Sequence, residues 1–177
     1  MQLCQPYGLP TASCAGRSTF DSRTTVSQRV ALVQQFPLFS GIPAADCTSI
    51  VSAAHERYFS RRQTIFYEGD PIRQILLLTS GCVKETQFSQ SGSEVILRLN
   101  RPGELVGPLG YSREGHRSTA RALQPSKALV WDAASFEAES ERFPTLRRNL
   151  AHILGQRLEE LEERFRGSAL LRRLLRE

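Results

Sequence analysis

The sequence predicts a mainly β protein, an antiparallel β-roll (jelly roll) with flanking helices and a long C-terminal helix. Between residues 58 and 132, short apolar runs alternate with Gly- and Pro-containing turns. Their spacing of roughly 8–12 residues is typical of an antiparallel sandwich or barrel. No helix-length pattern lies between these runs, which argues against a parallel βαβ sheet. From Pro144 onward, the apolar residues recur instead with the period of a helix.

The N-terminal part predicts a leader followed by two short helices. Residues 1–26 are rich in Ser, Thr, Gly and Pro, a composition that favours a flexible segment. The first helix ends at Pro37, and Pro43 opens the second, with His55 expected on its polar side. The predicted buried positions of the two helices are Val30, Leu32, Val33, Phe36, Cys47, Ile50, Val51 and Ala54.

Strands follow in order, each bounded by residues that favour turns. The β-branched and aromatic residues at 64–67 favour a strand, and the Glu-Gly-Asp-Pro sequence at 68–71 ends it. Gly81 and Gly92 mark two later turns. The predicted strands are 58–59, 64–67, 75–78, 82–88, 94–99, 118–123 and 128–132.

The C-terminal region predicts a short helix at 134–139 and a long helix that starts at Pro144 and ends or kinks at residues 167–168. Its apolar stripe ends with spacings of four, three and four residues, which are those of a coiled-coil seam and predict a homodimer. The seam covers only about two heptads, so packing of the helix on its own roll stays open. The predicted dimerisation residues are Leu150, Leu154, Leu158, Leu161 and Phe165.

Composition narrows the function classes. A net charge of +5 is compatible with a nucleic-acid partner but does not require one. No apolar run approaches the roughly 20 residues of a membrane span, and the N-terminus lacks the pattern of a secretory signal. We therefore expect a cytoplasmic protein with no membrane partner, whose four cysteines are reduced thiols.

Motifs for catalysis and metal binding are missing from the sequence. Neither His55 nor His152 has a nucleophile near it in sequence. The sequence also has no Gly-x-Ser-x-Gly elbow, no His-Glu-x-x-His motif and no phosphate-binding Gly-x-x-x-x-Gly-Lys motif. The cysteine spacings do not match a zinc site. A cupin-like enzyme would need a His pair with an acidic residue, and no such set is present. We predict no catalytic residue, no metal ligand and no enzymatic activity.

The segment 102–122 carries the candidate site. Its glycines permit tight turns, and a short helical turn near 107–111 would direct backbone N–H groups at an anion. Arg117 and Ser118 would add charge-assisted hydrogen bonds to the same anion. In the alternative interpretation, the segment is a glycine-rich connection whose Arg117 is solvated or pairs with Glu114.

Several motifs in a fixed order resemble the Crp/Fnr family of bacterial transcription regulators. Residues 103–107 and 117–122 resemble the phosphate-binding cassette of its cyclic-nucleotide-binding domain. The other matching segments are 36–39, 65–70 and 80–84. The resemblance implies a sensor roll, a dimerisation helix and then a helix-turn-helix domain. The ligand-binding residues that it implies are Gly103, Glu104, Gly107, Leu109, Arg117, Ser118 and Thr119.

Two departures from the family pattern shape the functional prediction. Members that bind cyclic AMP have an acidic residue for the ribose hydroxyl directly after the second cassette glycine, where this chain has Pro108. The effector is therefore unknown, and a cyclic nucleotide is not favoured. The chain also stops at Glu177, before a helix-turn-helix could follow, so DNA would be bound only through a domain missing from these residues.

We thus predict three regions: a leader at 1–26, a cyclic-nucleotide-binding-like roll with its N-terminal helices at 27–139, and a dimerisation helix with the start of a truncated link at 140–177. The predicted function is the sensing of a small-molecule effector, and dimerisation, for a Crp/Fnr-type regulator. The alternative is a stand-alone ligand-binding or protein-interaction module of the same fold, with no DNA role.

Overall fold

A computed structural model describes residues 25–89, 92–108 and 115–174, with side chains up to residue 166. Nearly all of the predicted leader lies outside these residues, as does most of the predicted helical turn at 107–111. The helices are α1 (Val26–Val33), the 3-10 helix η1 (Pro37–Phe39), α2 (Ala44–Ser52), α3 (Ala133–Arg142) and α4 (Pro144–Leu174). The strands are β1 (His55–Phe59), β2 (Thr64–Phe66), β3 (Gln74–Ser80), β4 (Val83–Phe88), β5 (Glu94–Asn100), β6 (Leu105–Val106), β7 (Thr119–Ala122) and β8 (Ser126–Asp132).

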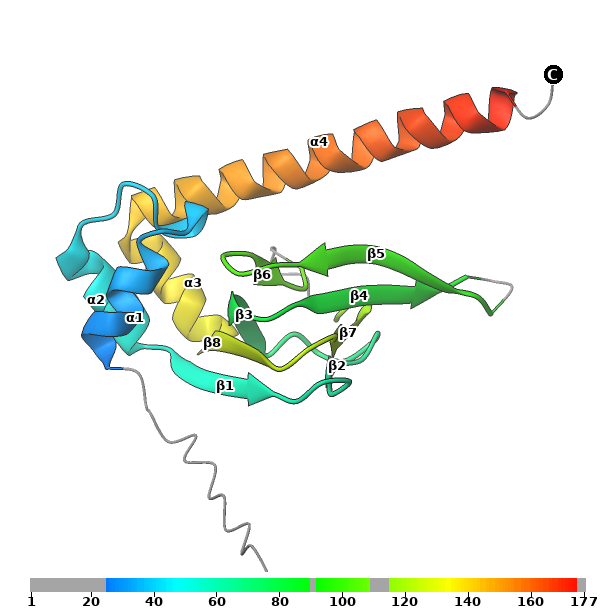
Figure 1. Cartoon of the computed structure of the whole chain (residues 1–177). Coiled ribbons are helices and arrows are strands. Elements are labelled where there is room, and N and C mark those ends of the chain that lie inside the picture. The colour runs from blue at the N-terminus through cyan, green and yellow to red at the C-terminus, as the bar shows by residue number, and fades with distance from the viewer. Residues whose placement is uncertain (1–24, 90–91, 109–114, 175–177) are drawn as a thin grey trace, which may run out of the picture.

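The strands form two antiparallel four-stranded sheets, which confirms the predicted roll. One sheet has the order β1-β8-β3-β6, and the other has the order β2-β7-β4-β5. Figure 1 shows the sheets facing each other, with α1, α2 and α3 gathered at one end of the roll. Because β4 lies between β7 and β5, its backbone is hydrogen-bonded along both sides.

The two inner strands of the sheet β1-β8-β3-β6, β8 and β3, are buried on both faces. Leu77 and Trp131 point towards the helices, whereas Leu76 and Val130 point towards the second sheet. This explains why β3 and β8 are continuous apolar runs without alternating polar positions. The Trp131 indole N–H donates to the carbonyl of Ile50 at 2.7 Å, which fixes α2 on this sheet.

The structure corrects two predictions and adds one strand. His55 is the first residue of β1 and does not lie on a helix, because α2 ends at Ser52. The strand β6 was not predicted, since its two residues carry no periodicity of their own and pair with distant β3. The helix α4 continues past residues 167–168 to Leu174. A glycine costs a helix only about 1 kcal/mol, which is too little to end one this long.

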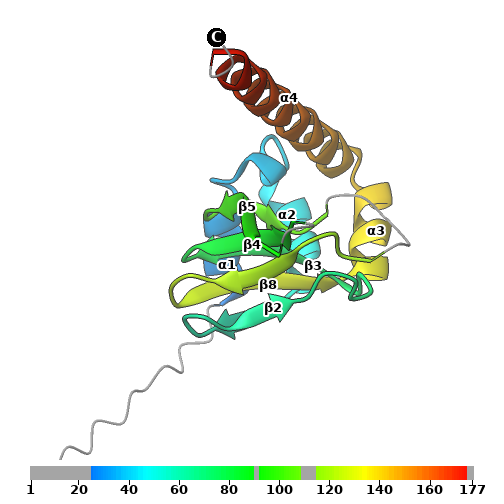
Figure 2. The same ribbon diagram turned by 90° about the vertical axis from the view of Figure 1, so that its right-hand side faces the viewer.

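The helix α4 starts on the core and then runs above β5 and β6 (Figure 1). Figure 2 shows its C-terminal end projecting away from the roll. Leu150 is 8% exposed and belongs to the core of its own chain, so this member of the predicted dimer stripe is buried. The later members are exposed: Leu154 by 42%, Leu158 by 59%, Leu161 by 48% and Phe165 by 74%.

No helix among the described residues is both long enough and apolar enough to cross a membrane.

Candidate functional site

A buried carboxylate lies at the centre of the candidate site. Glu85 is in β4, two residues after Val83, so its side chain has the same inward direction as this core residue. Only 8% of Glu85 is exposed. The pairing of β4 with β5 shifts register between Glu85 and Thr86. Such a bulge locally changes the strand, and bulges are common beside functional sites.

Three donors from separate segments converge on this carboxylate. The Asn100 side-chain amide donates to Glu85 Oε1 at 2.7 Å, and the Gly107 backbone N–H donates to the same oxygen at 3.0 Å. The Ser118 hydroxyl donates to Oε2 at 3.0 Å. Asn100 and Ser118 are buried as well. Burial of a carboxylate is costly unless it is hydrogen-bonded, and these contacts meet that requirement.

Arg157 of α4 contacts the same loop from the other side. Its guanidinium donates to the Gly107 carbonyl at 3.1 Å and to the Leu105 carbonyl. Gly107 is therefore held by Glu85 through its N–H and by Arg157 through its carbonyl. The loop that follows β6 thus connects the buried carboxylate to the long helix.

The electrostatic surroundings of Arg157 are mixed. Burial and the neighbouring Arg98 lower the pKa of Arg157 to about 10, against the attraction of Glu85, Glu104 and Glu160. The arginine is still cationic at neutral pH. Arg98 also lies 3.3 Å from Glu160 of α4 and 3.6 Å from Glu104. These partly exposed ion pairs add little stability individually, but they align α4 with β5 and the loop.

An aromatic wall borders the site. The rings of Phe66 and His116 stack with their centroids 3.6 Å apart. Both rings lie beside Gly107, where a Cβ atom would come within 3.1 Å of Phe66 and 3.4 Å of His116. His116 is buried, and burial lowers its pKa, against the opposing effects of Asp70 and Glu85.

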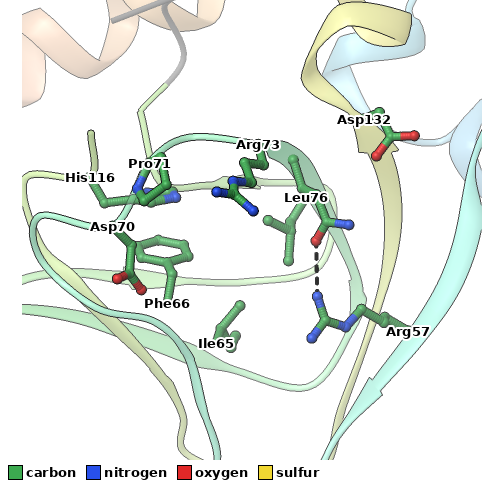
Figure 3. Close-up of a pocket in the computed structure, with 10 residues that line it drawn as sticks. Arg57, Ile65, Phe66, Asp70, Pro71, Arg73, Leu76, His116 and Asp132 are labelled. Carbon is green, nitrogen blue, oxygen red and sulfur yellow. Dashed lines mark hydrogen bonds between the residues drawn. The ribbon is translucent and has the colours of Figure 1, made fainter. Parts of the chain in front are cut away.

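Beyond this wall is an open cavity of about 590 Å³ (Figure 3). Figure 3 shows the Arg73 guanidinium directed into it, with Phe66 and His116 on one side and Arg57 on the other. Arg57 donates to the Gln74 side chain at 2.9 Å. The remaining lining residues are Ile65, Asp70, Pro71, Leu76 and Asp132.

The structure brings some of the predicted ligand residues together and separates others. Gly107 and Ser118 meet at Glu85, whereas Thr119 accepts from the Glu68 backbone N–H at 3.1 Å. Arg117 is exposed, and its carbonyl accepts from the Gln87 side chain at 3.2 Å.

The first part of the cassette has a structural role in the loop. Gly103 has a φ of 89° and lies so close to Phe36 that a Cβ atom would approach the ring to 2.9 Å. Glu104 accepts from the Arg101 backbone N–H at 2.7 Å. Pro108 is half-buried directly after the loop, and Leu109 lies outside the described residues.

Sequence reasoning missed Glu85, Asn100 and Arg157. A signal for Glu85 did exist, because a charged residue in phase with the inward-facing Val83 breaks the alternation expected of a strand. No comparable signal marks Arg157, which lies beside Leu158 in a helix rich in Arg and Glu. Within the part of the chain that the structure describes, no group of three or more metal-ligating side chains gathers.

Comparisons with known proteins agree with this architecture. Residues 56–142 match the cyclic nucleotide-binding domain. A cyclic AMP receptor protein of Thermus thermophilus is 32% identical over 127 residues, which are 71% of this chain and 59% of the relative. The transcriptional activator protein Anr of Pseudomonas aeruginosa is 27% identical over 104 residues, which are 59% of this chain and 43% of that protein.

Solved structures agree as well. The catabolite activator protein of Thermus thermophilus superimposes with a TM-score of 0.67 at 30% identity, over 75% of this chain and 63% of that one. A cAMP-binding acyltransferase from Mycobacterium smegmatis shares the fold alone, with a TM-score of 0.64 at 22% identity over 76% of this chain and 42% of that one.

The roll, its helical cover and its glycine-rich loop thus form a sensor domain of the cyclic-nucleotide-binding type. The chain is similar to regulators of the Crp/Fnr family, and it spans 59–63% of the length of the Thermus thermophilus relatives that it matches.

Proposed function

We propose that this chain is the effector-sensing and dimerisation region of a Crp/Fnr-type transcription regulator. The observation that carries the proposal is the contact of Arg157 with the carbonyls of Leu105 and Gly107. It joins the loop of the candidate site to α4, so a ligand that moves this loop also changes the position of the helix.

The proposed mechanism is a population shift between two positions of α4. A small-molecule effector that binds one position more tightly would favour it. Arg164, which donates to the Leu97 carbonyl at 2.8 Å, is a second contact that such a shift would change. DNA would be bound by a segment outside these residues, whose orientation follows from α4.

The second part of the proposal is a homodimer through α4. Exposed apolar side chains of α4 and β5 lie on neighbouring elements, because Arg98 and Arg164 connect the two. A large exposed apolar surface on a folded protein marks an interaction site. The exposed apolar residues of β5 are Val95, Ile96, Leu97 and Leu99.

Substitution within the exposed stripe tests this dimer. The double variant Leu158→Glu/Leu161→Glu places four like charges in the interface of a dimer, and we expect it to be monomeric by light scattering while the wild type is dimeric. The control Glu159→Gln/Glu163→Gln changes exposed polar residues of the same helix and should remain dimeric. A leucine variant that stays dimeric would place the interface elsewhere.

A further inference from the structure

We propose that the Glu85 carboxylate occupies the position in the candidate site where the phosphate of a ligand would bind. It thereby excludes phosphate-bearing ligands such as cyclic nucleotides. This inference rests on the proposed function, because it concerns the ligand class of the same effector site. It makes Glu85 a residue that determines specificity, independently of Pro108.

The geometry of the donors supports this assignment. Converging N–H and O–H groups in a site shielded from water form an anion-binding site. Here the donors are Asn100, Gly107 and Ser118, from the end of β5, the loop after β6 and the segment before β7. All three donate to Glu85. A ligand anion at this position would therefore have to displace the carboxylate from hydrogen bonds of 2.7–3.0 Å.

Displacement is opposed by the location of Glu85. Its strand β4 is the inner neighbour of both β7 and β5, with Glu85 opposite Ala120 on one side and Arg98 on the other. The backbone cannot move away without breaking both ladders. Rotation of the side chain alone would break the hydrogen bonds to Asn100, Gly107 and Ser118, and a buried carboxylate that loses its hydrogen bonds is destabilised.

The charge balance leads to the same conclusion. Arg157 is a cation that is attracted to Glu85. Its guanidinium already donates hydrogen bonds to the Leu105 and Gly107 carbonyls. A phosphate beside Glu85 would add a like charge in a region of low dielectric constant, where repulsion is strong. The wild-type site therefore favours an effector that has no anionic group at this position.

The test measures binding of two probes to the whole chain by isothermal titration calorimetry. Inorganic phosphate has no ribose, so its binding tests the phosphate position alone and does not depend on the acidic residue that Pro108 replaces. Cyclic AMP tests the complete cassette. The variants are Glu85→Ala and Glu85→Gln. Glu94→Gln, which removes the charge of an exposed carboxylate on β5, is the matched control.

We expect no saturable binding of either probe to the wild type or to Glu94→Gln. Glu85→Ala should bind phosphate saturably, about tenfold or more above the detection limit that the wild-type titration sets, because the substitution frees three hydrogen-bond donors and removes the like charge. Glu85→Gln keeps the size of the side chain and should show a smaller gain. The added substitution Arg117→Ala should reduce the gain in cyclic AMP binding if the ligand occupies the predicted cassette.

Two results would overturn the inference. One is that the wild type binds cyclic AMP as tightly as Glu85→Ala does, and that the nuclear magnetic resonance signal of the Gly107 amide shifts on binding, which would place the ligand at this site. The other is folded Glu85 variants that bind neither probe more tightly than the wild type. Circular dichroism checks folding, and Glu85→Gln carries the test if Glu85→Ala does not fold. Light scattering of the same samples keeps the outcomes distinct, since a monomeric wild type would count against the proposed dimer and leave the binding result intact.

Discussion

At the scale of single residues, Gly115 joins the candidate site to the turn between β2 and β3. The His116 N–H donates to the Asp70 carbonyl, and the Gly69 N–H donates to the His116 carbonyl, both at 2.8 Å. A Cβ atom on Gly115 would lie 2.8 Å from the Asp70 carbonyl oxygen and 3.0 Å from that of Gly69. A side chain at position 115 would therefore force these two hydrogen bonds apart.

We predict that Gly115→Ala destabilises the protein more than Gly69→Ala does. Both glycines have a positive φ, so both variants have the cost of a left-handed alanine, about 1–2 kcal/mol. Gly69 faces open space, whereas Gly115→Ala has the additional cost of overpacking, about 1–3 kcal/mol. Urea unfolding of the two variants measures the difference. Equal stabilities would show that the 69–70 turn can move away from residue 115.

His116 should give the protein a pH-dependent stability. Its folded pKa is lowered below 6.5, so the unfolded chain binds a proton more readily than the folded one. The free energy of unfolding therefore contains a contribution that is present above about pH 6.5 and is lost as the pH falls towards the folded pKa. We expect His116→Gln to reduce this slope between pH 7.5 and 5.5, roughly the range in which histidine titrates. The control His152→Gln, at an exposed position of α4, should keep the slope of the unfolding free energy against pH. An unchanged slope in His116→Gln would show that other groups cause the pH dependence.

At the scale of elements, one side chain joins the middle of α4 to the loop after β6. Arg157→Ala leaves the carbonyls of Leu105 and Gly107 without their charged donor. We expect a loss of about 1.5–3 kcal/mol in the free energy of unfolding, the usual contribution of a hydrogen bond to a charged group. Arg147→Ala removes an exposed arginine of the same helix and should change stability by less than about 0.5 kcal/mol.

Hydrogen exchange gives this prediction a second readout. If Arg157 holds the loop, the Gly107 amide should exchange faster in Arg157→Ala than in Arg147→Ala. Without Arg157 the loop opens more often, and the hydrogen bond from the Gly107 N–H to Glu85 breaks more often with it. Unchanged protection in both variants would mean that Glu85 alone fixes the loop.

The elements also show how far a single sequence predicts this fold. The strands β3 and β8 were predictable because each carries consecutive apolar residues, as expected where both faces are buried. The Glu85 network was not predictable, because its partners Asn100, Gly107 and Ser118 are 15, 22 and 33 residues away. They meet only after β4, β5 and β7 have paired, and a single sequence contains no information on that register.

At the scale of the whole molecule, the apolar stripe predicted for α4 serves two environments. Leu150 is in the core, so this part of the helix packs on its own chain, as the alternative interpretation of the sequence expected. The exposed part of the stripe begins at Leu154. The periodicity of the sequence is the same in both parts. It therefore gave no indication of where the contacts within the chain end, and the dimer role of the exposed part stays a prediction.

The exposed part of the stripe leads to a prediction about the stability of the whole molecule. If the homodimer buries this surface, unfolding is coupled to dissociation, and mass action raises the melting temperature with protein concentration. We expect this rise for the wild type and expect it to disappear in Leu158→Glu/Leu161→Glu. Because the substituted leucines are 59% and 48% exposed, a monomeric variant should keep its folded core. A wild-type melting temperature independent of concentration would contradict the dimer, since the folded chain would then gain nothing from its second copy.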